Sequence, residues 1–392
     1  MSIINTILSV YFIVGFLMWL VFFFSVLKII KEVPVIDEFT DPELSNWPML
    51  SLIIPACNEE TTIEASVRKR LKEDYPNLEL IIINDRSTDC TGEIIDRIAL
   101  EDKRIKALTI TELPKGWLGK VHAQQKGLEQ AKGEYLLFSD ADVHYEPGTL
   151  KKIIAYCEAN FVDHLSAIPE LWAPNFIVEV IYTIFGRLFL AGLQAWKVNN
   201  PKSRAYIGVG AFNLVRRESF ERTEGFEYLK MDIADDVALG KLMKRAGMNS
   251  KFVNGRKRIG LLFHPSIKNL IVSSERATFS TMGNFSAVIL SLKNIFWTLM
   301  ELSPFLMFIP FRIPYLNYLG FATVFLAILT SSMLNRWTNR PILPAFFIPL
   351  GIPFITYANF RAAWLGWKRK GIIWRGTYYS SKELKKGKRV SL

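Results

Sequence analysis

Cysteine and histidine are scarce in this chain of 392 residues, which contains three cysteines and four histidines. Cys57, Cys90 and Cys157 are too few and too scattered to form a disulfide framework or a zinc site. A free thiol near the end of a strand mostly packs as a small apolar side chain. The free cysteines fit a reducing, cytosolic setting. The histidines show no metal-ligand spacing, so we assign none of them a catalytic role.

Charged residues are missing from most of the first apolar stretch, which runs from Thr6 to Ile30 and has no charge before Lys28. At about 1.5 Å per residue, such a helix is long enough to cross a hydrocarbon core of ~30 Å. A signal peptide is the alternative, but the stretch lacks a basic start, is too long, and precedes no cleavage site of small residues. We therefore predict a retained transmembrane anchor over residues 1–30, followed by a polar linker over 31–48.

Acidic residues are nearly absent from the C-terminal segment 367–392, where nine lysines and arginines face only Glu383. This segment contributes much of the net charge of +11. Basic clusters beside membrane segments are usually cytoplasmic and attract anionic lipid headgroups. Nucleic-acid binding is the rival interpretation of a basic tail. Next to so much membrane-length sequence we favour the lipid bilayer as partner and expect no nucleic acid.

The later apolar segments set the expected topology. We predict two transmembrane helices over residues 314–366 and an interfacial or re-entrant segment over 277–313, which Lys293 and Glu301 interrupt. If 277–313 also crossed the membrane, the basic tail would lie opposite the soluble block, against the positive-inside rule. The sequence thus predicts a multi-pass protein of the cell membrane with its soluble domain in the cytosol. Residues 176–198 favour a helix at the membrane surface, with a buried amphipathic helix equally open.

The block from 49 to 276 has the pattern of an α/β domain. Short apolar runs near 50–54, 78–85, 104–110 and 134–140 alternate with helical patterns over 61–73 and 119–133. Such alternation predicts βαβ units and a mostly parallel sheet. Ligands of these sheets bind beyond the carboxyl ends of the strands.

Polar and acidic motifs occur at those strand ends. The first strand leads through Pro55 into Asn58-Glu59, the second ends in Asn84-Asp85, and the fourth is followed by Asp140-Ala141-Asp142. Lys120 opens a helix in "GKVHA", and Asp235-Asp236 opens another in "ADD". A single D-x-D occurs by chance in many proteins, and Asp235-Asp236 also suits a helix dipole. The convergence of several motifs on one sheet edge is what indicates a site.

In this order, "PACNEE", "NDRSTD", "GKVHA", "SDAD" and "ADD" resemble the motifs of the family 2 glycosyltransferases, from about Leu50 to Arg276. The resemblance implies a nucleotide-sugar-binding α/β domain of the GT-A type over residues 49–276, in addition to the transmembrane helices. It also implies a UDP-sugar donor, because the family aspartate matched by Asp85 typically binds uracil. Pro55, Asn58 and Glu59 then line the base and ribose, and Lys120 contacts the donor phosphates or sugar unless it is simply solvated.

The resemblance assigns Asp142 as the direct metal ligand and Asp140 as a second ligand or a donor contact. A hard divalent ion, Mg²⁺ or Mn²⁺, would neutralise the leaving diphosphate. Asp236 matches the family's catalytic base and Asp235 is its neighbour; Asp232 is the alternative. One base without an enzymic nucleophile implies inversion of the anomeric carbon.

Two departures from the family pattern bear on the acceptor. The Q-x-x-R-W motif of processive synthases is reduced to Arg276 in "SSERA", and Arg86 stands where the family usually has glycine. We therefore expect transfer of one hexose to a membrane lipid, as in the carotenoid-, hopanoid- and ceramide-type members. A polysaccharide synthase and an inactive nucleotide-sugar-binding scaffold are the alternatives. The aromatic segment Trp374–Tyr379 is expected either to anchor in the interface or to close over the site.

Overall fold

The computed structural model describes residues 3–40, 44–306 and 314–390. Its centre is a seven-stranded sheet with the order β3-β2-β1-β4-β8-β6-β9. The first four strands in the chain are mutually parallel: β1 (Leu50–Ala56), β2 (Leu78–Asp85), β3 (Ile105–Ile110) and β4 (Tyr135–Phe138). β8 (Asn213–Arg216) is antiparallel to β4 and to β6 (His164–Ile168), which pairs in parallel with β9 (Ser250–Asn254). The predicted α/β fold with a mostly parallel sheet is confirmed.

Alternating apolar residues give this sheet two buried faces. Leu52, Ile54 and Leu80 pack with helices on one face, whereas Ile53 and Ile81 pack with helices on the other. The first face is covered by α2 (Ile63–Arg70), α3 (Thr91–Glu101) and α5 (Thr149–Ala159). The second is covered by α4 (Gly119–Gln130), α8 (Gly225–Leu229) and α9 (Asp235–Arg245). Helices on both faces hold the strand ends at one rigid edge.

β1 continues beyond the apolar run at 50–54, through Pro55, to Ala56. The pairing of β1 with β4 ends at Ile53, whose carbonyl accepts a hydrogen bond from Ser139 N. The missing N–H of Pro55 therefore falls beyond the end of β4, where it breaks no ladder.

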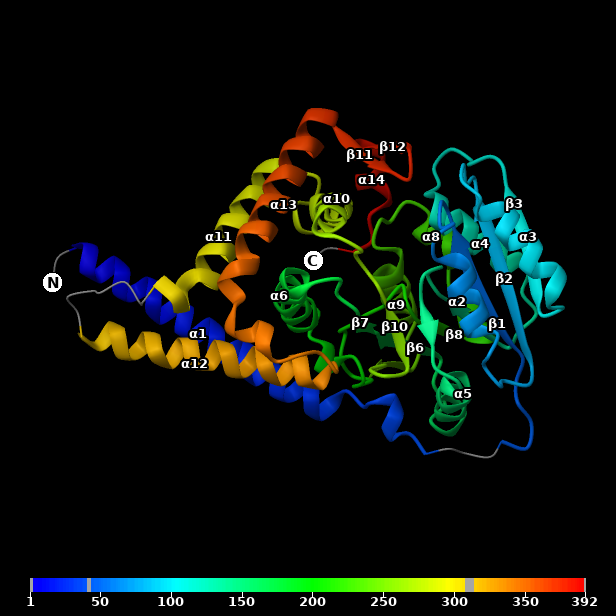
Figure 1. The fold of residues 1–392 in the computed structure, drawn as a ribbon, viewed down its shortest axis with the longest axis horizontal. Coiled ribbons are helices and arrows are strands. Elements are labelled where there is room, and N and C mark those ends of the chain that lie inside the picture. Colours follow the sequence, from blue (N-terminus) through cyan, green and yellow to red (C-terminus); the bar gives the residue numbers. More distant parts are fainter. Residues whose placement is uncertain (1–2, 41–43, 307–313, 391–392) are drawn as a thin grey trace.

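A small three-stranded sheet flanks the main sheet, with β10 (Ile259–Leu261) between β5 (His144–Tyr145) and β7 (Glu170–Leu171). Short helix α7 (Arg217–Glu221) follows β8. α6 (Phe176–Gly192) and α10 (Ile267–Ala277) lie between the sheet domain and the remaining helices (Figure 1).

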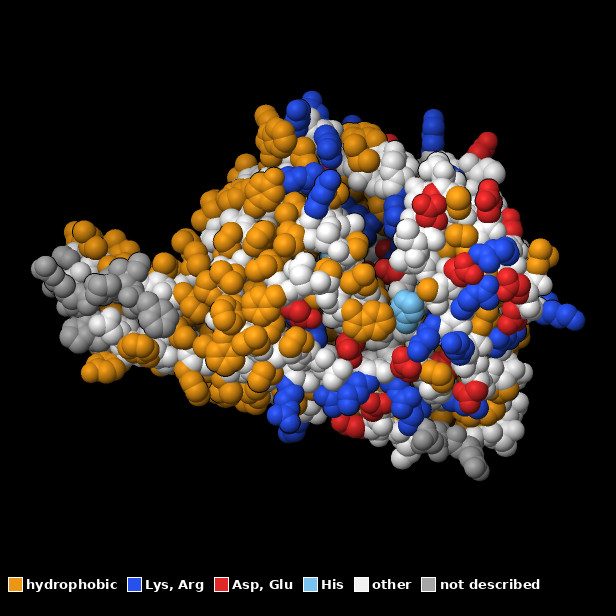
Figure 2. All heavy atoms as spheres, viewed as in Figure 1, with side chains coloured by type: hydrophobic (Ala, Val, Ile, Leu, Met, Phe, Trp, Pro, Cys, Tyr) orange, Lys and Arg blue, Asp and Glu red, His pale blue; other side chains and the backbone are white. Residues whose placement is uncertain are grey.

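The apolar helices extend away from the sheet domain, with α1 (Ile3–Glu32) packed beside α12 (Pro314–Trp337) (Figure 1). α11 (Ala287–Leu306) packs against α13 (Ile348–Arg369). The chain ends in the hairpin of β11 (Gly371–Trp374) and β12 (Thr377–Ser380), followed by α14 (Ser381–Gly387). Figure 2 shows hydrophobic side chains gathered over this half of the molecule and charged side chains over the sheet domain.

Within the described residues, three helices are long and apolar enough to cross a membrane: Ile3–Glu32, Phe176–Lys197 and Tyr315–Trp337. A fourth candidate is the pair Ile267–Met282 and Ala287–Leu306, which is bent by 102° and fits either a broken span or a re-entrant loop. α13 does not meet the same criterion. The predicted segments 277–313 and 314–366 stay predictions, and residues 307–313 lie outside the described part.

Candidate active site

The loop that contains Asp140 and Asp142 follows a fully buried strand and is held by α2. Arg70, which is completely buried, donates hydrogen bonds to Ser139 Oγ at 3.1 Å and to the carbonyl of Asp140 at 2.5 Å. The Ser66 hydroxyl donates to the carbonyl of Ala141. These contacts fix the turn, so that its two carboxylates leave the sheet in a set direction.

Lys120 joins two of the predicted motifs. Its Nζ lies 2.7 Å from Asp140 Oδ1 and 3.3 Å from Asp235 Oδ2. Burial alone would lower the pKa of Lys120, but the charges of Asp140 and Asp235 outweigh burial and hold that pKa above its ordinary value. Burial would raise the pKa of Asp140, yet Lys120 holds it below the ordinary range. The lysine is thus an integral cation of the site and not a solvated surface residue.

Gly210 connects Asp140 with the pair at the start of α9. Its carbonyl accepts from Asp140 N at 2.9 Å, and its own N–H donates to Asp236 Oδ2 at 2.9 Å. A Cβ atom at Gly210 would come within 2.5 Å of Asp140 Oδ2. Only glycine permits this approach, which brings the two acidic motifs to the same place.

The three acids near α9 have different surroundings. Asp235 is buried and also accepts from Gln124 Nε2 at 3.3 Å. Asp232 is buried under the C-terminal segment and accepts from Val390 N at 3.0 Å and from Ala234 N. Asp236 keeps some contact with solvent. The burial of its carboxyl group and the charge of Asp235 nevertheless raise its pKa to about 6. Of the three, Asp236 is the carboxylate best placed to take a proton.

Asp142 lies among other acids. Burial raises its pKa to about 7, with further contributions from the charges of Asp140 and Glu59. The described residues contain no group of three or more His, Cys, Asp or Glu side chains arranged to hold a metal ion. A cation at Asp142 would therefore need ligands from a bound molecule, as Mg²⁺ commonly takes from substrate phosphates.

The first two strand ends are tied to one another. Asn58 Oδ1 accepts from Thr88 N at 2.8 Å, and Asn58 N donates to Ser87 Oγ at 3.1 Å. Glu59 N donates to Thr91 Oγ1 at 2.7 Å. Much of the polarity of Asn58 is thus used to hold the loop after β2, while the Glu59 side chain stays at the edge.

Asp85 and Arg86 form a closed pair. Arg86 Nε donates to Asp85 Oδ1 at 2.7 Å and Arg86 Nη2 donates to Asp85 Oδ2 at 3.1 Å. Arg86 has a positive φ of 56°, the conformation that glycine would adopt more easily. The turn therefore keeps its shape despite the arginine, but any base that Asp85 contacts also meets a guanidinium.

The segment Trp374–Tyr379 belongs to the β11–β12 hairpin, which contacts the start of α4. Tyr379 OH accepts from Gly119 N at 3.3 Å, one residue before Lys120. The sequence could not decide between this position and an interfacial anchor.

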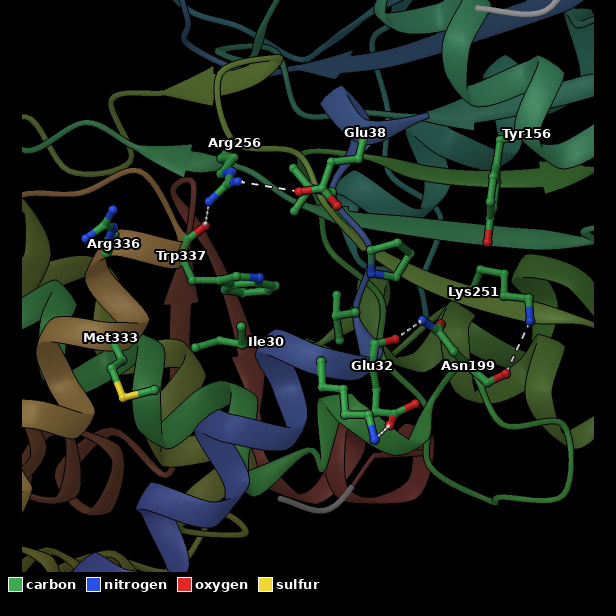
Figure 3. A pocket seen from close by; sticks show the side chains of 14 residues that line it. Ile30, Glu32, Glu38, Tyr156, Asn199, Lys251, Arg256, Met333, Arg336 and Trp337 are labelled. Carbon is green, nitrogen blue, oxygen red and sulfur yellow. Dashed lines mark hydrogen bonds and ion pairs between the residues drawn. The ribbon is translucent and has the colours of Figure 1, made fainter. Parts of the chain in front are cut away.

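A pocket among the described residues lies away from these side chains. It has a volume of about 710 Å³ and opens where the ends of α1 and α12 meet the sheet domain (Figure 3). Its walls include Glu32, Lys251, Arg256 and Trp337, and none of the predicted site residues.

Several residues of the site were missed from sequence. Arg70 had one available signal, since an arginine on the apolar face of a short helix needs a buried acceptor. Gly210, in contrast, gave none, because its role depends on a contact between distant segments.

Comparison with known proteins gives a consistent picture. Residues 51–223 match the model of the family described as Glycosyl transferase family 2. An uncharacterised glycosyltransferase of Haemophilus influenzae is 35% identical over 158 residues, 40% of this chain and 46% of that protein. The GalNAc(5)-diNAcBac-PP-undecaprenol beta-1,3-glucosyltransferase of Campylobacter jejuni is 30% identical over 107 residues, 27% of this chain and 34% of that protein.

The chain therefore spans less than half the length of these curated relatives. Among solved structures, a mannosyltransferase from Pyrobaculum calidifontis in complex with GDP-Man and Mn²⁺ has a TM-score of 0.53. It is 18% identical, and the match covers 93% of this chain and 96% of that one. At this identity the likeness establishes the fold alone.

Proposed function

We propose, because residues 51–223 match the model of Glycosyl transferase family 2, that the protein transfers a single hexose from a UDP-sugar to a membrane lipid, with inversion, at the cytosolic face. The observation that supports this most is the Lys120 bridge. It brings the D-x-D loop and the acidic pair of α9 into one site, with Nζ to carboxylate distances of 2.7 and 3.3 Å.

A divalent cation fits this site chemically. Asp142 faces the negative charges of Asp140 and Glu59, which together with burial raise its pKa. We propose that Asp142, with help from Asp140, would hold Mg²⁺ or Mn²⁺. When bound, the ion would offset the negative charge of the departing diphosphate. The Mn²⁺ bound to the mannosyltransferase of the same fold supports a metal of this kind.

Asp236 would act as general base. Its carboxylate takes the proton of the acceptor hydroxyl as that oxygen forms a bond to the anomeric carbon. The bond from that carbon to the diphosphate breaks on the opposite side, which inverts the configuration. Lys120 would orient Asp140 and Asp235 during this step, and Glu59, Asn58, Asp85 and Pro55 would line the donor.

Apolar surface beside the site supports a lipid acceptor. The ring of Trp172 lies 5.5 Å from that of His144, two residues after Asp142. Phe176 at the start of α6 lies 5.3 Å from Phe347, just before α13. Three of these aromatic side chains are about two-fifths exposed: Trp172 (41%), Phe176 (39%) and Phe347 (40%). They would give a hydrocarbon chain a path between the candidate membrane helices and the site.

Two substitutions test the proposal. Purified Asp142→Asn and Asp236→Asn variants should no longer transfer hexose from UDP-hexoses to total membrane lipids. Mass spectrometry of the lipids measures the product. Asp236→Asn should still bind UDP, because the base does not hold the donor. Asp96→Asn, on the exposed side of α3, is the matched control and should remain active. Full activity in both site variants contradicts the proposal.

The size of the product separates this function from polymer synthesis. A lipid with one added hexose supports single transfer, whereas a ladder of longer products would indicate a polysaccharide synthase. Turnover of any nucleotide sugar excludes an inactive scaffold.

A further inference from the structure

The C-terminal hairpin lies outside the matched family region and yet contacts the donor side of the site. β11 and β12 pair antiparallel with Trp374 opposite Thr377, so the loop consists of Arg375 and Gly376. Both have positive φ, 47° and 79° respectively. This is the backbone of a tight two-residue hairpin turn, in which a non-glycine residue such as Arg375 is strained. Strained residues of this kind concentrate at ligand-binding sites.

The turn places Arg375 against the end of β1. Its Nη2 donates to the carboxylate of Glu59, and its Nη1 lies 3.5 Å from the carbonyl of Asn58. Two more residues fix the second strand of the hairpin. Thr377 Oγ1 accepts from Arg86 Nη1 at 3.4 Å, and Tyr379 OH accepts from Gly119 N at 3.3 Å. The hairpin thus contacts three segments: the loop after β1, the loop after β2 and the start of α4.

Trp374 ties the hairpin to a fourth segment. The guanidinium of Arg276 in α10 stacks over the Trp374 ring, with its carbon 4.2 Å from the ring centre. In residues 3–40, 44–306 and 314–390 no carboxylate forms an ion pair with Arg276. The charges of Asp235, Asp140 and Arg375 all act on it. Arg276 and Arg375 are therefore two neighbouring guanidinium groups at one edge of a site rich in carboxylates.

The present partner of Arg375 is replaceable. Its side chain is 46% exposed and that of Glu59 is 19% exposed. Ion pairs with so much solvent contact contribute only about 0–1 kcal/mol. A diphosphate has more charge than a carboxylate, and two of its oxygens match the fork of a guanidinium. Since β1 pairs directly with β4, Glu59 and Asp142 follow neighbouring strands at the same edge of the sheet, and a diphosphate near Asp142 would lie within reach of Arg375.

We propose that the C-terminal hairpin completes the donor site and that Arg375 leaves Glu59 to bind the diphosphate of the nucleotide. The inference rests on the proposed function, from which it takes the nucleotide-diphosphate donor. It adds a phosphate-binding residue some 150 residues beyond the matched region and makes the hairpin a cover that closes on the donor. Trp374 would be a positioning residue, because it acts through Arg276.

The test compares diphosphate with monophosphate binding in the full chain. Binding of UDP, UMP, GDP and GMP in the presence of Mg²⁺ is measured by calorimetry for the parent, Arg375→Ala and Arg375→Lys. Arg375→Ala should weaken diphosphate binding by about 10- to 100-fold, as for a lost charge-assisted hydrogen bond. Monophosphate binding should change by less than about threefold, since one phosphate offers fewer contacts. Arg375→Lys should be intermediate. Lys382→Ala, an exposed cation of the same C-terminal segment, should match the parent.

Hydrogen exchange of the peptide 371–380 provides a second readout that does not depend on the affinity of the alanine variant. UDP should slow its exchange in the parent and in Arg375→Lys, and not in Arg375→Ala. Equal losses for diphosphates and monophosphates, or none for either, would overturn the inference. If the parent transfers sugar while Arg375→Ala binds diphosphate normally, only this inference fails. If the parent binds no diphosphate, the proposed function fails with it.

Discussion

At the scale of single residues, the position of Asp236 predicts a pH dependence. Burial and the charge of Asp235 raise its pKa to about 6, and Lys120 opposes them. A general base must be unprotonated. The rate therefore reaches its full value above this pKa and falls as the pH decreases through it. We expect kcat/KM at pH 5 to be about tenfold lower than at pH 7. Donor binding measured at each pH separates this effect from loss of the donor. A rate that stays constant down to pH 5 contradicts the assignment.

Glu73 predicts a pH dependence of stability. The carboxyl is 2% exposed and accepts from Gly148 N at 2.9 Å; burial raises its pKa to about 7. The folded state therefore binds this proton more tightly than the unfolded state, and the resulting stability is lost as the pH rises through 7. Glu73→Gln should unfold at a higher temperature at pH 8, with a gain of about 1–3 kcal/mol.

The gain in Glu73→Gln should disappear at pH 5, where the parent carboxyl is already protonated in the folded state. Thermal unfolding of the purified protein at both pH values measures it. Glu112→Gln, on an exposed loop, is the control and should give no pH-dependent difference. A gain of the same size at both pH values would show that charge is not the cause.

The position of Arg86 beside Asp85 predicts a preference for one nucleotide base over another. The Asp85–Arg86 pair presents a hydrogen-bond donor beside an acceptor, since Arg86 has N–H groups and Asp85 has carboxylate lone pairs. Uracil has a donor at N3 and an acceptor at O4, whereas cytosine has an acceptor at N3 and a donor at N4, so the two roles are exchanged in position. Arg86→Gly, which suits the positive φ of 56°, should lower the preference for UDP over CDP by about tenfold. An unchanged ratio of the two dissociation constants would exclude this role.

The sequence could anticipate the position of a residue in the fold where a strand determines that position. Asp85, Asp140 and Asp142 follow runs of buried apolar residues, and the pattern of those runs fixes the edge at which the acids emerge. The sequence pattern could not identify the role of Gly210 or the hydrogen bond from Val390 N to the Asp232 carboxylate. Both depend on contacts between segments far apart in the chain.

At the scale of elements, a buried ion pair connects three apolar helices. Arg187 Nη2 of α6 lies 2.7 and 2.6 Å from the two carboxylate oxygens of Glu301 in α11. The same guanidinium lies 4.1 Å from the ring of Trp19 in α1. Breaking a buried pair leaves an uncompensated charge and costs about 3–5 kcal/mol, whereas removing both charges costs much less.

Arg187→Met should therefore lower folding yield and unfolding temperature strongly, and Arg187→Met combined with Glu301→Met should recover most of both. Size-exclusion profiles and thermal unfolding in detergent measure these changes. Lys126→Met removes one partner of an exposed pair on α4, whose side chains are 45% and 41% exposed. It should change stability by less than about 1 kcal/mol. A double variant no better than Arg187→Met would show that the pair is not what holds α6 to α11.

Elements built from local pattern were the ones that sequence could anticipate. The alternation over residues 50–140 defined β1 to β4, because each parallel strand is followed by its own helix. The insertion of β8 antiparallel between β4 and β6 was not anticipated, since the partner of a strand is set by tertiary packing. The hairpin β11–β12 was ambiguous for the same reason: its aromatic residues suit an interface and a binding site equally well.

At the scale of the whole molecule, contacts of the C-terminal segment limit the topology. Lys388 donates to the carbonyl of Ser280 at 2.8 Å, and Val390 N donates to Asp232 at 3.0 Å. The tail and the sheet domain are therefore expected on the same side of any membrane. The end of α12 also touches this domain, since Asn339 Nδ2 donates to Glu170 Oε2 at 2.7 Å. Both ends of α13 thus lie near the catalytic domain, which favours α11 and α12 over α12 and α13 as the two crossings.

Cysteine labelling decides between these two arrangements. Leu343→Cys lies just before α13 at a residue that is 57% exposed, and Lys385→Cys lies in α14 after it. In a Cys90→Ser background, which removes the exposed native thiol, an impermeant maleimide is added to inside-out and right-side-out vesicles. We expect both new cysteines to react only in the inside-out vesicles, because α13 begins and ends at the cytosolic face. Labelling of the two sites from opposite faces would instead make α13 a true span.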